Sequence, residues 1–370
     1  MKKILLLLLS LSMLINASSI DPKTLEIGSK APDFKLTGTD GKSYSLASFS
    51  RAKILVVVFT CNHCPTAQAY EDRIIKLTQN YKDKGVQVVA ISTNDPSAVR
   101  LDELGYTDLS DSFEEMKIRY KDKNYNLPYL YDGATQVTSL AYGAVATPHV
   151  FIFNQARTLQ YVGRFDDVEK PTGTPQNNNA IDAVEALLAG KSVAVPKTKT
   201  FGCSIKWKEK SDWIEKGKAE WAKEEAKLEP INPEGLRKLL KNDTDKLRVI
   251  NVWATWCGPC VVEFPEFVTM NRMYRGRDFE FVSITADKPT QREKALKFLK
   301  AKQASNTNYI LDGMDIYQFI EIVDPKWQGA LPYTLIIEPG GKKIYTKQGA
   351  INALEIRKKI VESPTVGRYY

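Results

Sequence analysis

The sequence predicts an α/β protein of two domains, each with a mixed central sheet, joined by a charged helical linker. The chain has 370 residues and 43% hydrophobic composition, which is enough to bury two cores. The same order of expected elements, β-α-β-α-β-β-α, occurs twice and is typical of α/β domains. Between the repeats, residues 208–230 are rich in Lys, Glu and Ala, which favours a solvated helix. We therefore expect domains at residues 20–207 and 231–370.

Elements of the first domain are predicted from short continuous apolar runs, typical of buried strands, and from apolar residues at helical spacing. The expected strands are residues 52–59, 86–93, 127–132, 149–153 and 158–165. The expected helices are residues 67–81 and 136–144. A polar, helix-rich insertion at residues 95–125 lies between the second and third strands.

The second domain repeats this order. Its expected strands are residues 247–254, 279–287, 308–312, 333–338 and 342–349, and its expected helices are residues 260–274 and 291–302. Pro339-Gly340-Gly341 predicts the turn of the last hairpin. In the linker, Trp213 and Trp221 are eight residues apart, so one face of the helix could pack on a domain.

Residues 1–19 are predicted to be a secretory signal peptide. Two lysines precede an apolar stretch at residues 4–15, and small residues follow at positions 17–19. The stretch is short for the alternative, an uncleaved membrane anchor. We therefore expect a protein that is secreted across the inner membrane into the periplasm.

The charge pattern argues against nucleic acid as a partner. The formal net charge is +8, and losing the two lysines of the signal peptide would remove two charges and leave +6. The basic residues are spread over mixed Lys/Glu segments, without an arginine-rich cluster or an interleaved aromatic platform.

Four of the five cysteines form two C-x-x-C pairs, Cys61/Cys64 and Cys257/Cys260. Each pair directly follows an expected buried strand and precedes an expected helix. A cysteine at a helix N-terminus is favoured as thiolate by unpaired backbone N–H groups and the helix dipole. We therefore expect thiol-disulfide exchange, with the first cysteine of each pair as nucleophile and the second resolving the mixed disulfide.

Other uses of these cysteines are weaker predictions. A closed zinc site needs four ligands, and besides the pairs the chain offers only His63, His149 and Cys203. A purely structural C-x-x-C disulfide would add little stability, because its loop is tiny. We expect no metal and no cofactor besides the redox-active disulfides. Cys203 is either a small buried hydrophobe or a third thiol that takes oxidation away from the first pair.

The segment "VINVWATWCGPCVVEFPEF" resembles the TlpA/ResA-like branch of the thioredoxin fold, the extracytoplasmic thiol-disulfide oxidoreductases, and the likeness covers about residues 231–362. The resemblance implies that Glu263 assists proton transfer at the dithiol; a solvated surface carboxylate is the alternative. It also implies a cis-proline at Pro332 and substrate binding by Leu331, Pro332 and Trp256. That family more often has valine or threonine where Leu331 stands.

Residues 27–208 resemble the redoxin family allied to AhpC/TSA peroxiredoxins, in the group that carries "CNHCP". The motifs are "APDFKLTGTDGKSYSLASF", "YEDRI", "VVAISTND", "PYLYD", "ATPHVFIF", "GRFDD" and "GCSIKW". Thr147 and Pro148 match the cis-proline position and are expected to bind substrate. Peroxiredoxins have a proline seven and a threonine three residues before the peroxidatic cysteine. Ile54 and Val58 hold those positions here, which weighs against a peroxidase.

The two centres are expected to differ in redox poise. His63 can stabilise the thiolate of the first pair, which makes that disulfide more oxidising. "CGPC" lacks such a group and is associated with reducing members of the fold, so electrons should run from the second domain to the first. His63 could instead be a neutral bystander. Ala67 stands where the second site has Glu263, so proton handling must differ.

The predicted function is periplasmic thiol-disulfide exchange by two thioredoxin-like domains, most simply as a reductant of protein disulfides. The family relation implies a membrane electron donor of the DsbD/CcdA type. One alternative is a thiol peroxidase whose second domain reduces the first. Another is a copper- or zinc-binding module at "CNHC".

Overall fold

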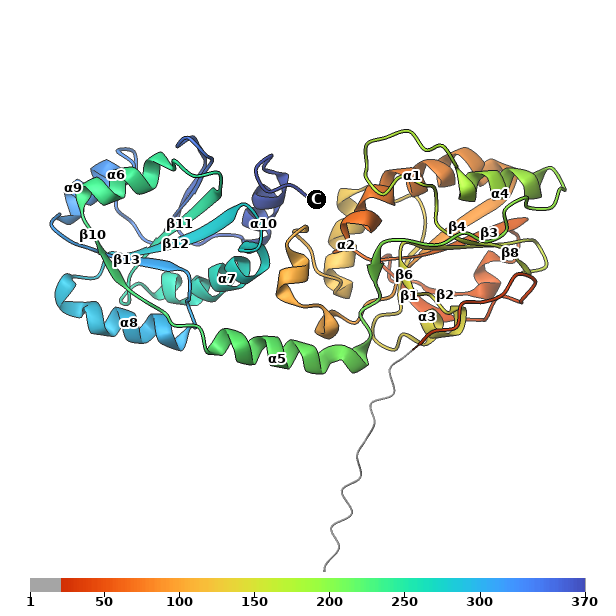
Figure 1. Ribbon diagram of the computed structural model, residues 1–370, viewed down its shortest axis with the longest axis horizontal. Coiled ribbons are helices and arrows are strands. Elements are labelled where there is room, and N and C mark those ends of the chain that lie inside the picture. Colours follow the sequence, from red (N-terminus) through yellow and green to blue (C-terminus); the bar gives the residue numbers. More distant parts are fainter. Residues whose placement is uncertain (1–20, 370) are drawn as a thin grey trace, which may run out of the picture.

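The computed structural model describes residues 21–369 and shows two α/β domains joined by a helix (Figure 1). Each domain is built on one mixed β-sheet, as predicted. The predicted signal peptide, and its alternative as an anchor, fall in residues 1–19 and lie outside the described residues. No helix within residues 21–369 combines the length and apolar character that crossing a bilayer requires.

The first sheet has the strand order β2-β1-β5-β4-β3-β7-β8. Its strands are β1 (Lys35–Gly38), β2 (Ser43–Ser45), β3 (Ile54–Thr60), β4 (Val86–Ser92), β5 (Tyr129–Tyr131), β7 (His149–Phe153) and β8 (Leu159–Gly163). Strands β3, β4 and β5 run parallel, whereas β7 is antiparallel to β3 and to β8. Every residue of β3 is buried, because helices cover both faces of the sheet.

The helices of the first domain are α1 (Pro65–Tyr81), α2 (Phe113–Asp122), α3 (Val137–Tyr142) and α4 (Asn179–Leu188). Helices α1, α2 and α4 pack on one face of the sheet, and α3 packs on the other. Helix α1 begins at a proline, whose missing N–H would have no partner in the first turn anyway. Its side chains Tyr70, Ile74 and Leu77 recur at helical spacing and enter the core.

The second sheet has the strand order β10-β13-β12-β11-β14-β15. Its strands are β10 (Glu229–Ile231), β11 (Leu247–Trp253), β12 (Phe279–Thr285), β13 (Thr307–Leu311), β14 (Tyr333–Ile337) and β15 (Lys343–Gln348). The first four run parallel, and β14 and β15 are antiparallel additions at one edge. The central strand β11 therefore corresponds to β3 of the first domain.

The helices of the second domain are α6 (Pro233–Lys241), α7 (Gly258–Tyr274), α8 (Arg292–Ala301), α9 (Ile316–Val323) and α10 (Ala353–Glu362). Helices α6 and α9 cover one face, and α7, α8 and α10 cover the other. Helix α7 starts two residues before its expected first residue, and α8 is one residue shorter at each end than expected.

Sequence analysis gave no residue ranges for helices α4, α6, α9 and α10, and it also missed several short strands. These strands are the β1–β2 hairpin, strand β10, and a separate two-stranded ladder of β6 (Ala146–Thr147) with β9 (Cys203–Ser204). None is longer than four residues. Strands of this length carry no readable periodicity, so only pairing with distant partners defines them.

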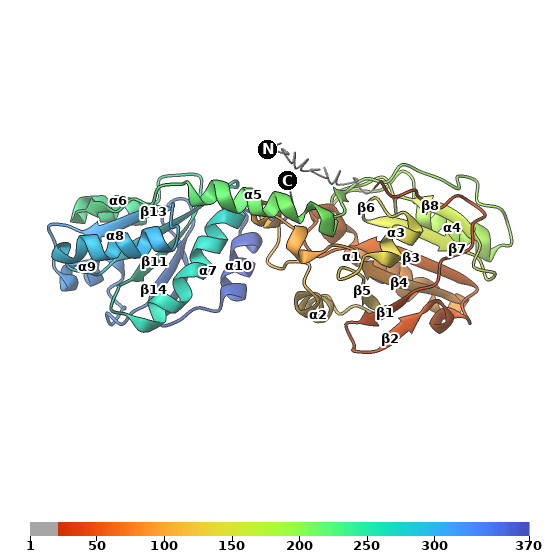
Figure 2. The same cartoon turned by 90° about the horizontal axis from the view of Figure 1, so that it is seen from below.

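The linker helix α5 (Ser211–Ala222) is shorter than the predicted segment of residues 208–230, because β10 already belongs to the second sheet. It runs along one side of the molecule from one domain to the other (Figure 2). Trp213 is 65% exposed, whereas the guanidinium of Arg272 lies 5.0 Å from the centre of the Trp221 ring. The helix is therefore attached to the second domain at its C-terminal end.

The domains also touch directly, through the predicted insertion at residues 95–125. Apolar side chains of this insertion join the core that α7 and α10 build. The Tyr274 hydroxyl, at the end of α7, donates to the Thr107 carbonyl oxygen at 2.7 Å. The guanidinium of Arg368 pairs with the buried carboxylate of Asp108 at 2.6 Å. The insertion thus forms the interface between the domains.

Candidate active sites

Both C-x-x-C pairs lie where a central parallel strand passes into a helix, β3 into α1 and β11 into α7. The peptide bonds Thr147–Pro148 and Leu331–Pro332 are both cis, as expected from the resemblance. They precede β7 and β14, the strands that pair with β3 and β11. Each C-x-x-C pair therefore lies at the end of its central strand and beside a cis-proline.

The helix starts at a different cysteine in the two domains. The N-cap of α1 is the second cysteine of its pair, Cys64. The N-cap of α7 is the first cysteine, Cys257, whose sulfur accepts the Cys260 N–H at 3.3 Å. Because unpaired N–H groups favour negative charge, the first helix favours a thiolate at Cys64 and the second at Cys257.

The whole first pair is closed off from solvent, since no residue of 61–64 is more than 2% exposed. Burial, the hydrogen bond with Cys64 and the nearby Asp111 charge raise the pKa of Cys61 well above its ordinary value. Burial also opposes charge on Cys64. Hydrogen bonds with Cys203 and Cys61, and the charge of His63, nevertheless lower the pKa of Cys64 well below its ordinary value. These pKa directions favour the thiolate at Cys64, whereas Cys61 was the expected nucleophile.

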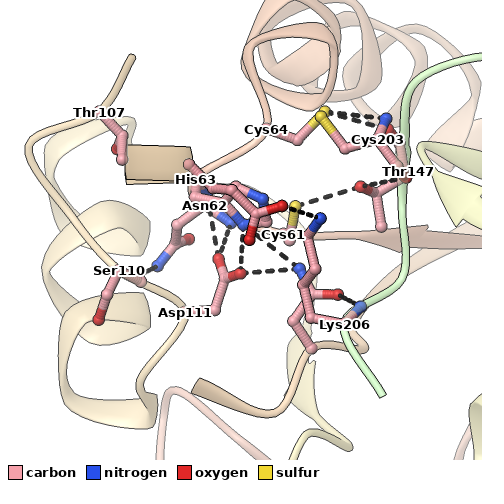
Figure 3. Close-up of polar contacts among 12 residues, drawn as sticks. Cys61, Asn62, His63, Cys64, Thr107, Ser110, Asp111, Thr147, Cys203 and Lys206 are labelled. Atoms are coloured by element: carbon pink, nitrogen blue, oxygen red, sulfur yellow. Dashed lines mark hydrogen bonds and ion pairs between the residues drawn. The ribbon is translucent and has the colours of Figure 1, made fainter. Parts of the chain in front are cut away.

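His63 is held by Asp111, a residue that sequence analysis missed. Its Nδ1 lies 2.5 Å from Asp111 Oδ2 (Figure 3). The other carboxylate oxygen accepts the backbone N–H groups of Asn62 and His63 at 2.7 and 3.1 Å. Burial lowers the pKa of His63, but the Asp111 carboxylate outweighs it and raises that pKa above the usual value. The Asp111 carboxylate thus favours the charged form of the imidazole, whose charge in turn favours the Cys64 thiolate.

The residue before the first cis-proline contacts both thiols. The Thr147 hydroxyl lies 3.2 Å from the Cys61 sulfur, and its carbonyl oxygen lies 3.3 Å from the Cys64 sulfur. Cys64 makes the second bond only as a thiol. These contacts place Thr147 and Pro148 at the dithiol, whereas substrate binding by them remains a prediction.

Cys203 also reaches the first pair, although it is 139 positions from Cys64 in the chain. It lies opposite Thr147 in the β6–β9 ladder, and its N–H donates to the Cys64 sulfur at 3.4 Å. Its partly buried side chain packs on Cys61, Cys64 and Ala67. Hydrogen bonding with Cys64 and burial raise the pKa of Cys203. Cys203 is therefore packed and adjoins the dithiol, while its role as a third thiol stays a prediction.

The second pair is joined as a Cys257–Cys260 disulfide. Glu263, one turn further along α7, is buried rather than solvated, and burial raises its pKa above the usual value. Its carboxylate accepts the Ile351 N–H at 2.9 Å and an N–H of Asn251 at 3.1 Å. A buried carboxylate with a raised pKa is suited to the proton transfer that the resemblance implies.

Beside the second pair is a cavity of about 310 Å³. Exposed Trp256 lines it together with Leu331, the residue before Pro332. Leu331 also packs on the apolar cluster that contains Cys257. The structure thus brings Trp256, Leu331 and Pro332 together near the disulfide, and their substrate contacts stay a prediction.

The sequence pattern of the AhpC/TSA family matches residues 27–162 and 225–345, one stretch in each domain. The chain belongs to the AhpC/TSA family. This AhpC/TSA protein is therefore a thioredoxin-fold oxidoreductase, which confirms the fold class and the broad enzyme class expected from the sequence.

Solved structures similar to this AhpC/TSA protein include a hypothetical protein from Sinorhizobium meliloti, 33% identical over 50% of this chain and 97% of that one, with a TM-score of 0.45. An uncharacterized conserved protein from Geobacillus kaustophilus is 34% identical over 51% and 96%, with a TM-score of 0.45. A thiol:disulfide interchange protein from Chlorobium tepidum is 17% identical over 45% and 99%, with a TM-score of 0.33.

A metal site in this AhpC/TSA protein would have to use Cys61, His63 and Asp111, whose ligand atoms all lie within 4.8 Å of one another. Within residues 21–369, this is the group of at least three His, Cys, Asp or Glu side chains placed closely enough to hold a metal ion. His63 and Asp111 already satisfy each other as a hydrogen-bonded pair. The three groups leave a closed tetrahedral zinc site one ligand short. The donor set therefore fits a charged histidine–carboxylate pair better than a metal.

The two dithiols of the AhpC/TSA protein do not face each other. Cys257 caps one end of α7, and Tyr274 at the other end contacts Thr107 of the first domain. At 1.5 Å per residue, 17 residues of helix place about 25 Å between these points. Asp111 of the first site follows Thr107 by four residues and contacts Asn62, His63 and Asn94 of its own domain. In this arrangement, the two dithiols do not touch, so the expected electron transfer between them cannot take place by direct contact.

Proposed function

We propose that this protein is an extracytoplasmic thiol-disulfide oxidoreductase that uses both dithiols and reduces disulfides in other proteins. The observation that carries the proposal is the N-cap position of Cys64 and Cys257, each beside a cis-proline. The thiolate is the reactive form in disulfide exchange, and a helix N-terminus favours it. Membership of the AhpC/TSA family supports the same class of chemistry.

At the second site, the reduced Cys257 thiolate attacks a substrate disulfide. A mixed disulfide forms, and one substrate sulfur leaves as a thiolate that takes up a proton. Cys260 then passes its proton toward ionised Glu263 and attacks the Cys257 sulfur. The substrate leaves with both sulfurs reduced, and the Cys257–Cys260 disulfide remains, which is the form in the structure.

Exposed apolar side chains near Cys257 support a protein as the substrate. Such residues mark interaction surfaces when they gather beside a cavity. Trp256 and Ile316 line the 310 Å³ cavity, and Tyr317 and Val262 are exposed nearby in sequence. An unfolded or loosely folded disulfide protein would present apolar segments to such a surface.

A dithiol partner must return the Cys257–Cys260 disulfide to the reduced form after each turnover. A membrane electron donor of the DsbD/CcdA type is the proposed partner, because a periplasmic location lacks a reducing thiol buffer. The first centre, in which His63 favours the Cys64 thiolate, is the more oxidising one, and the second is the donor.

Single-site variants test this assignment. Cys61→Ser/Cys64→Ser leaves only the second dithiol, and Cys257→Ser/Cys260→Ser leaves only the first. Redox titration of each should give the higher reduction potential for the first pair. A lower potential for the first pair would reverse donor and acceptor. Absence of disulfide reduction by either variant and by the full chain would refute the proposed function. The mass of the mature protein tests removal of residues 1–19.

Thiol peroxidase is the second candidate, and the family match over residues 27–162 favours it. The buried Cys61 with its raised pKa, and Ile54 and Val58 in place of the expected proline and threonine, oppose it. Stopped-flow oxidation by hydrogen peroxide distinguishes the two. We expect a rate near that of free cysteine; a far higher rate would favour the peroxidase. Metal analysis of protein purified without chelator tests the copper or zinc module.

A further inference from the structure

We propose that Cys203 is the third redox-active thiol of the first centre, that it forms a disulfide with Cys64, and that outside thiols reach the buried pair through it. This inference rests on the proposed function, because it assumes that the first dithiol exchanges electrons. It adds the entry point for those electrons, a residue outside the C-x-x-C motif.

The backbone pairing of β6 with β9 places Cys203 next to the first dithiol. Strand β9 pairs with β6, so that Cys203 lies opposite Thr147, the residue before the cis-proline. In the thioredoxin-like arrangement expected here, a substrate chain would bind at this position, and the protein's own segment occupies it. The Cys203 N–H reaches the Cys64 sulfur at 3.4 Å (Figure 3).

Gly202 makes this approach feasible. Its φ is +125°, a conformation that side chains rarely adopt. A Cβ atom there would lie 2.1 Å from the Thr147 carbonyl oxygen. Only glycine therefore lets residues 202 and 203 come this close to Thr147, and the close approach is what places Cys203 beside Cys64.

Exposure distinguishes the three thiols. Cys61 is 2% exposed and Cys64 is fully buried, whereas Cys203 is partly exposed. A thiol of a partner protein cannot reach a sulfur that has no accessible surface, because exchange requires attack along the S–S axis of the target disulfide. With the pair oxidised, Cys203 is the sulfur of this centre that an outside thiol can meet.

The chemistry balances without an added oxidant. Starting from the Cys61–Cys64 disulfide, Cys203 as thiolate attacks the Cys64 sulfur. The bond between Cys61 and Cys64 breaks, and Cys61 leaves as a thiolate that takes up the proton that Cys203 lost. The product is a Cys64–Cys203 disulfide with a free Cys61 thiol, so the oxidation level is unchanged.

A partner dithiol then reduces the centre from outside. Its first thiolate attacks the Cys203 sulfur, and Cys64 leaves as the thiolate that the helix N-terminus and His63 stabilise. The partner's second thiol attacks its own sulfur in the mixed disulfide and releases Cys203. The partner ends as a disulfide, the three cysteines end as thiols, and two electrons have entered. The raised pKa of Cys203 belongs to the reduced state, because its main cause is the bond with Cys64.

Disulfide mapping tests the pairing. In full-length Cys61→Ser/Cys257→Ser/Cys260→Ser protein, only Cys64 and Cys203 remain. After mild oxidation, alkylation of free thiols and digestion, we expect an intramolecular Cys64–Cys203 peptide in most molecules. Recovery of both cysteines as alkylated thiols, or of intermolecular dimers alone, would overturn the inference.

Exchange kinetics test the entry route. In the Cys257→Ser/Cys260→Ser background, Cys203→Ser should slow reduction of the Cys61–Cys64 disulfide by dithiothreitol at least tenfold. The matched control is Ser204→Ala, an exposed neighbour in β9, which should leave the rate unchanged. An unchanged rate in Cys203→Ser would overturn the inference, even if the full chain still reduces protein disulfides. Loss of all disulfide reduction in the unmodified chain would instead refute the proposed function.

Discussion

The acidity of Cys64 depends on His63, its neighbour in the motif, and on Asp111, which lies far from the motif in the chain. Asp111 is fully buried, and its Oδ2 lies 2.5 Å from His63 Nδ1. Its charge therefore affects Cys64 through His63. Burial raises the pKa of Asp111, but the His63 charge and hydrogen bonds hold it below its usual value. The Asp111 carboxylate thus favours the charged His63 imidazole, and the His63 charge favours the Cys64 thiolate.

Replacing Asp111 should therefore make Cys64 less acidic. In Asp111→Asn, the pKa of His63 falls because the carboxylate that raises it is gone, so the imidazole carries less positive charge to stabilise the Cys64 thiolate. The thiolate absorbance of reduced Cys257→Ser/Cys260→Ser protein, followed against pH, should move its midpoint upward by about one unit, or about tenfold in the thiolate-to-thiol ratio. Glu114→Gln removes an exposed charge from the same insertion and is the control. An equal midpoint in both variants would contradict the role of Asp111.

Glu263 is the corresponding proton carrier in the second domain. Its raised pKa brings its titration nearer to neutral pH, so it can both take and return a proton there. Glu263→Gln should slow the attack of Cys260 on the mixed disulfide by about 100-fold, while the first attack by Cys257 changes little. Rapid-quench trapping of the mixed disulfide measures the two steps separately. The control is the exposed Glu266→Gln, and parallel loss of both steps in Glu263→Gln would point to misfolding instead.

At the scale of elements, the helix starts at a different point of the motif in each domain and so favours a thiolate at a different cysteine. Proline follows the second cysteine in "CNHCP" and lies between the two in "CGPC". In α1 the helix begins at Pro65, whereas in α7 it begins at Gly258. A shift of the helix start by one turn relative to the motif therefore moves the favoured thiolate from the first cysteine to the second.

The β6–β9 ladder is the element that supplies the third thiol. Gly202→Ala should cost about 1–3 kcal/mol of unfolding free energy, because it strains the backbone and forces Thr147 away. It should also reduce the yield of the Cys64–Cys203 disulfide. Gly217→Ala is the matched control, since Gly217 lies in α5 with open space around its Cβ position and should be neutral or stabilising. Denaturant unfolding and disulfide mapping give the two readouts, and equal stability of both variants would contradict the close approach.

At the scale of the whole molecule, the interface keeps the two dithiols apart. The C-terminal ends of α7 and α10 and residues near Arg368 bind the insertion that carries Asp111. The second dithiol lies at the other end of α7. A partner can therefore reach the cavity at Trp256 while the domains stay in contact.

This separation predicts slow electron transfer between the sites of one molecule. After the second dithiol is reduced, oxidation of Cys257 by the first site should depend on protein concentration, because it takes place between molecules. An equimolar mixture of the two single-site variants should show nearly the same second-order rate as the intact chain. The measurement is a quench-alkylation time course at several micromolar concentrations. A fast, concentration-independent transfer in the intact chain would show that the domains reorient.

Much of the fold could be predicted because its signals are local. Buried strands such as β3 and β11 are continuous apolar runs, and the helices after them repeat apolar residues at helical spacing. The C-x-x-C pairs could be placed for the same reason, since each is defined within four residues, whereas the cis-prolines were expected only from the family resemblance. The hairpin β1–β2 and strand β10 could not, because strands of four residues or fewer have no period.

The sequence alone determined that this protein has two dithiols, each between a central strand and a helix, because those features depend on neighbours along the chain. Only the tertiary structure decided which sulfur is the acidic one in the first domain and what surrounds it. Asp111 reaches His63 from the insertion, Cys203 reaches Cys64 from the tail of the first domain, and no local pattern encodes such distant contacts. The charge of a buried thiol depends on the charged and hydrogen-bonding groups within a few ångströms, so its reactivity can be inferred only from the folded structure.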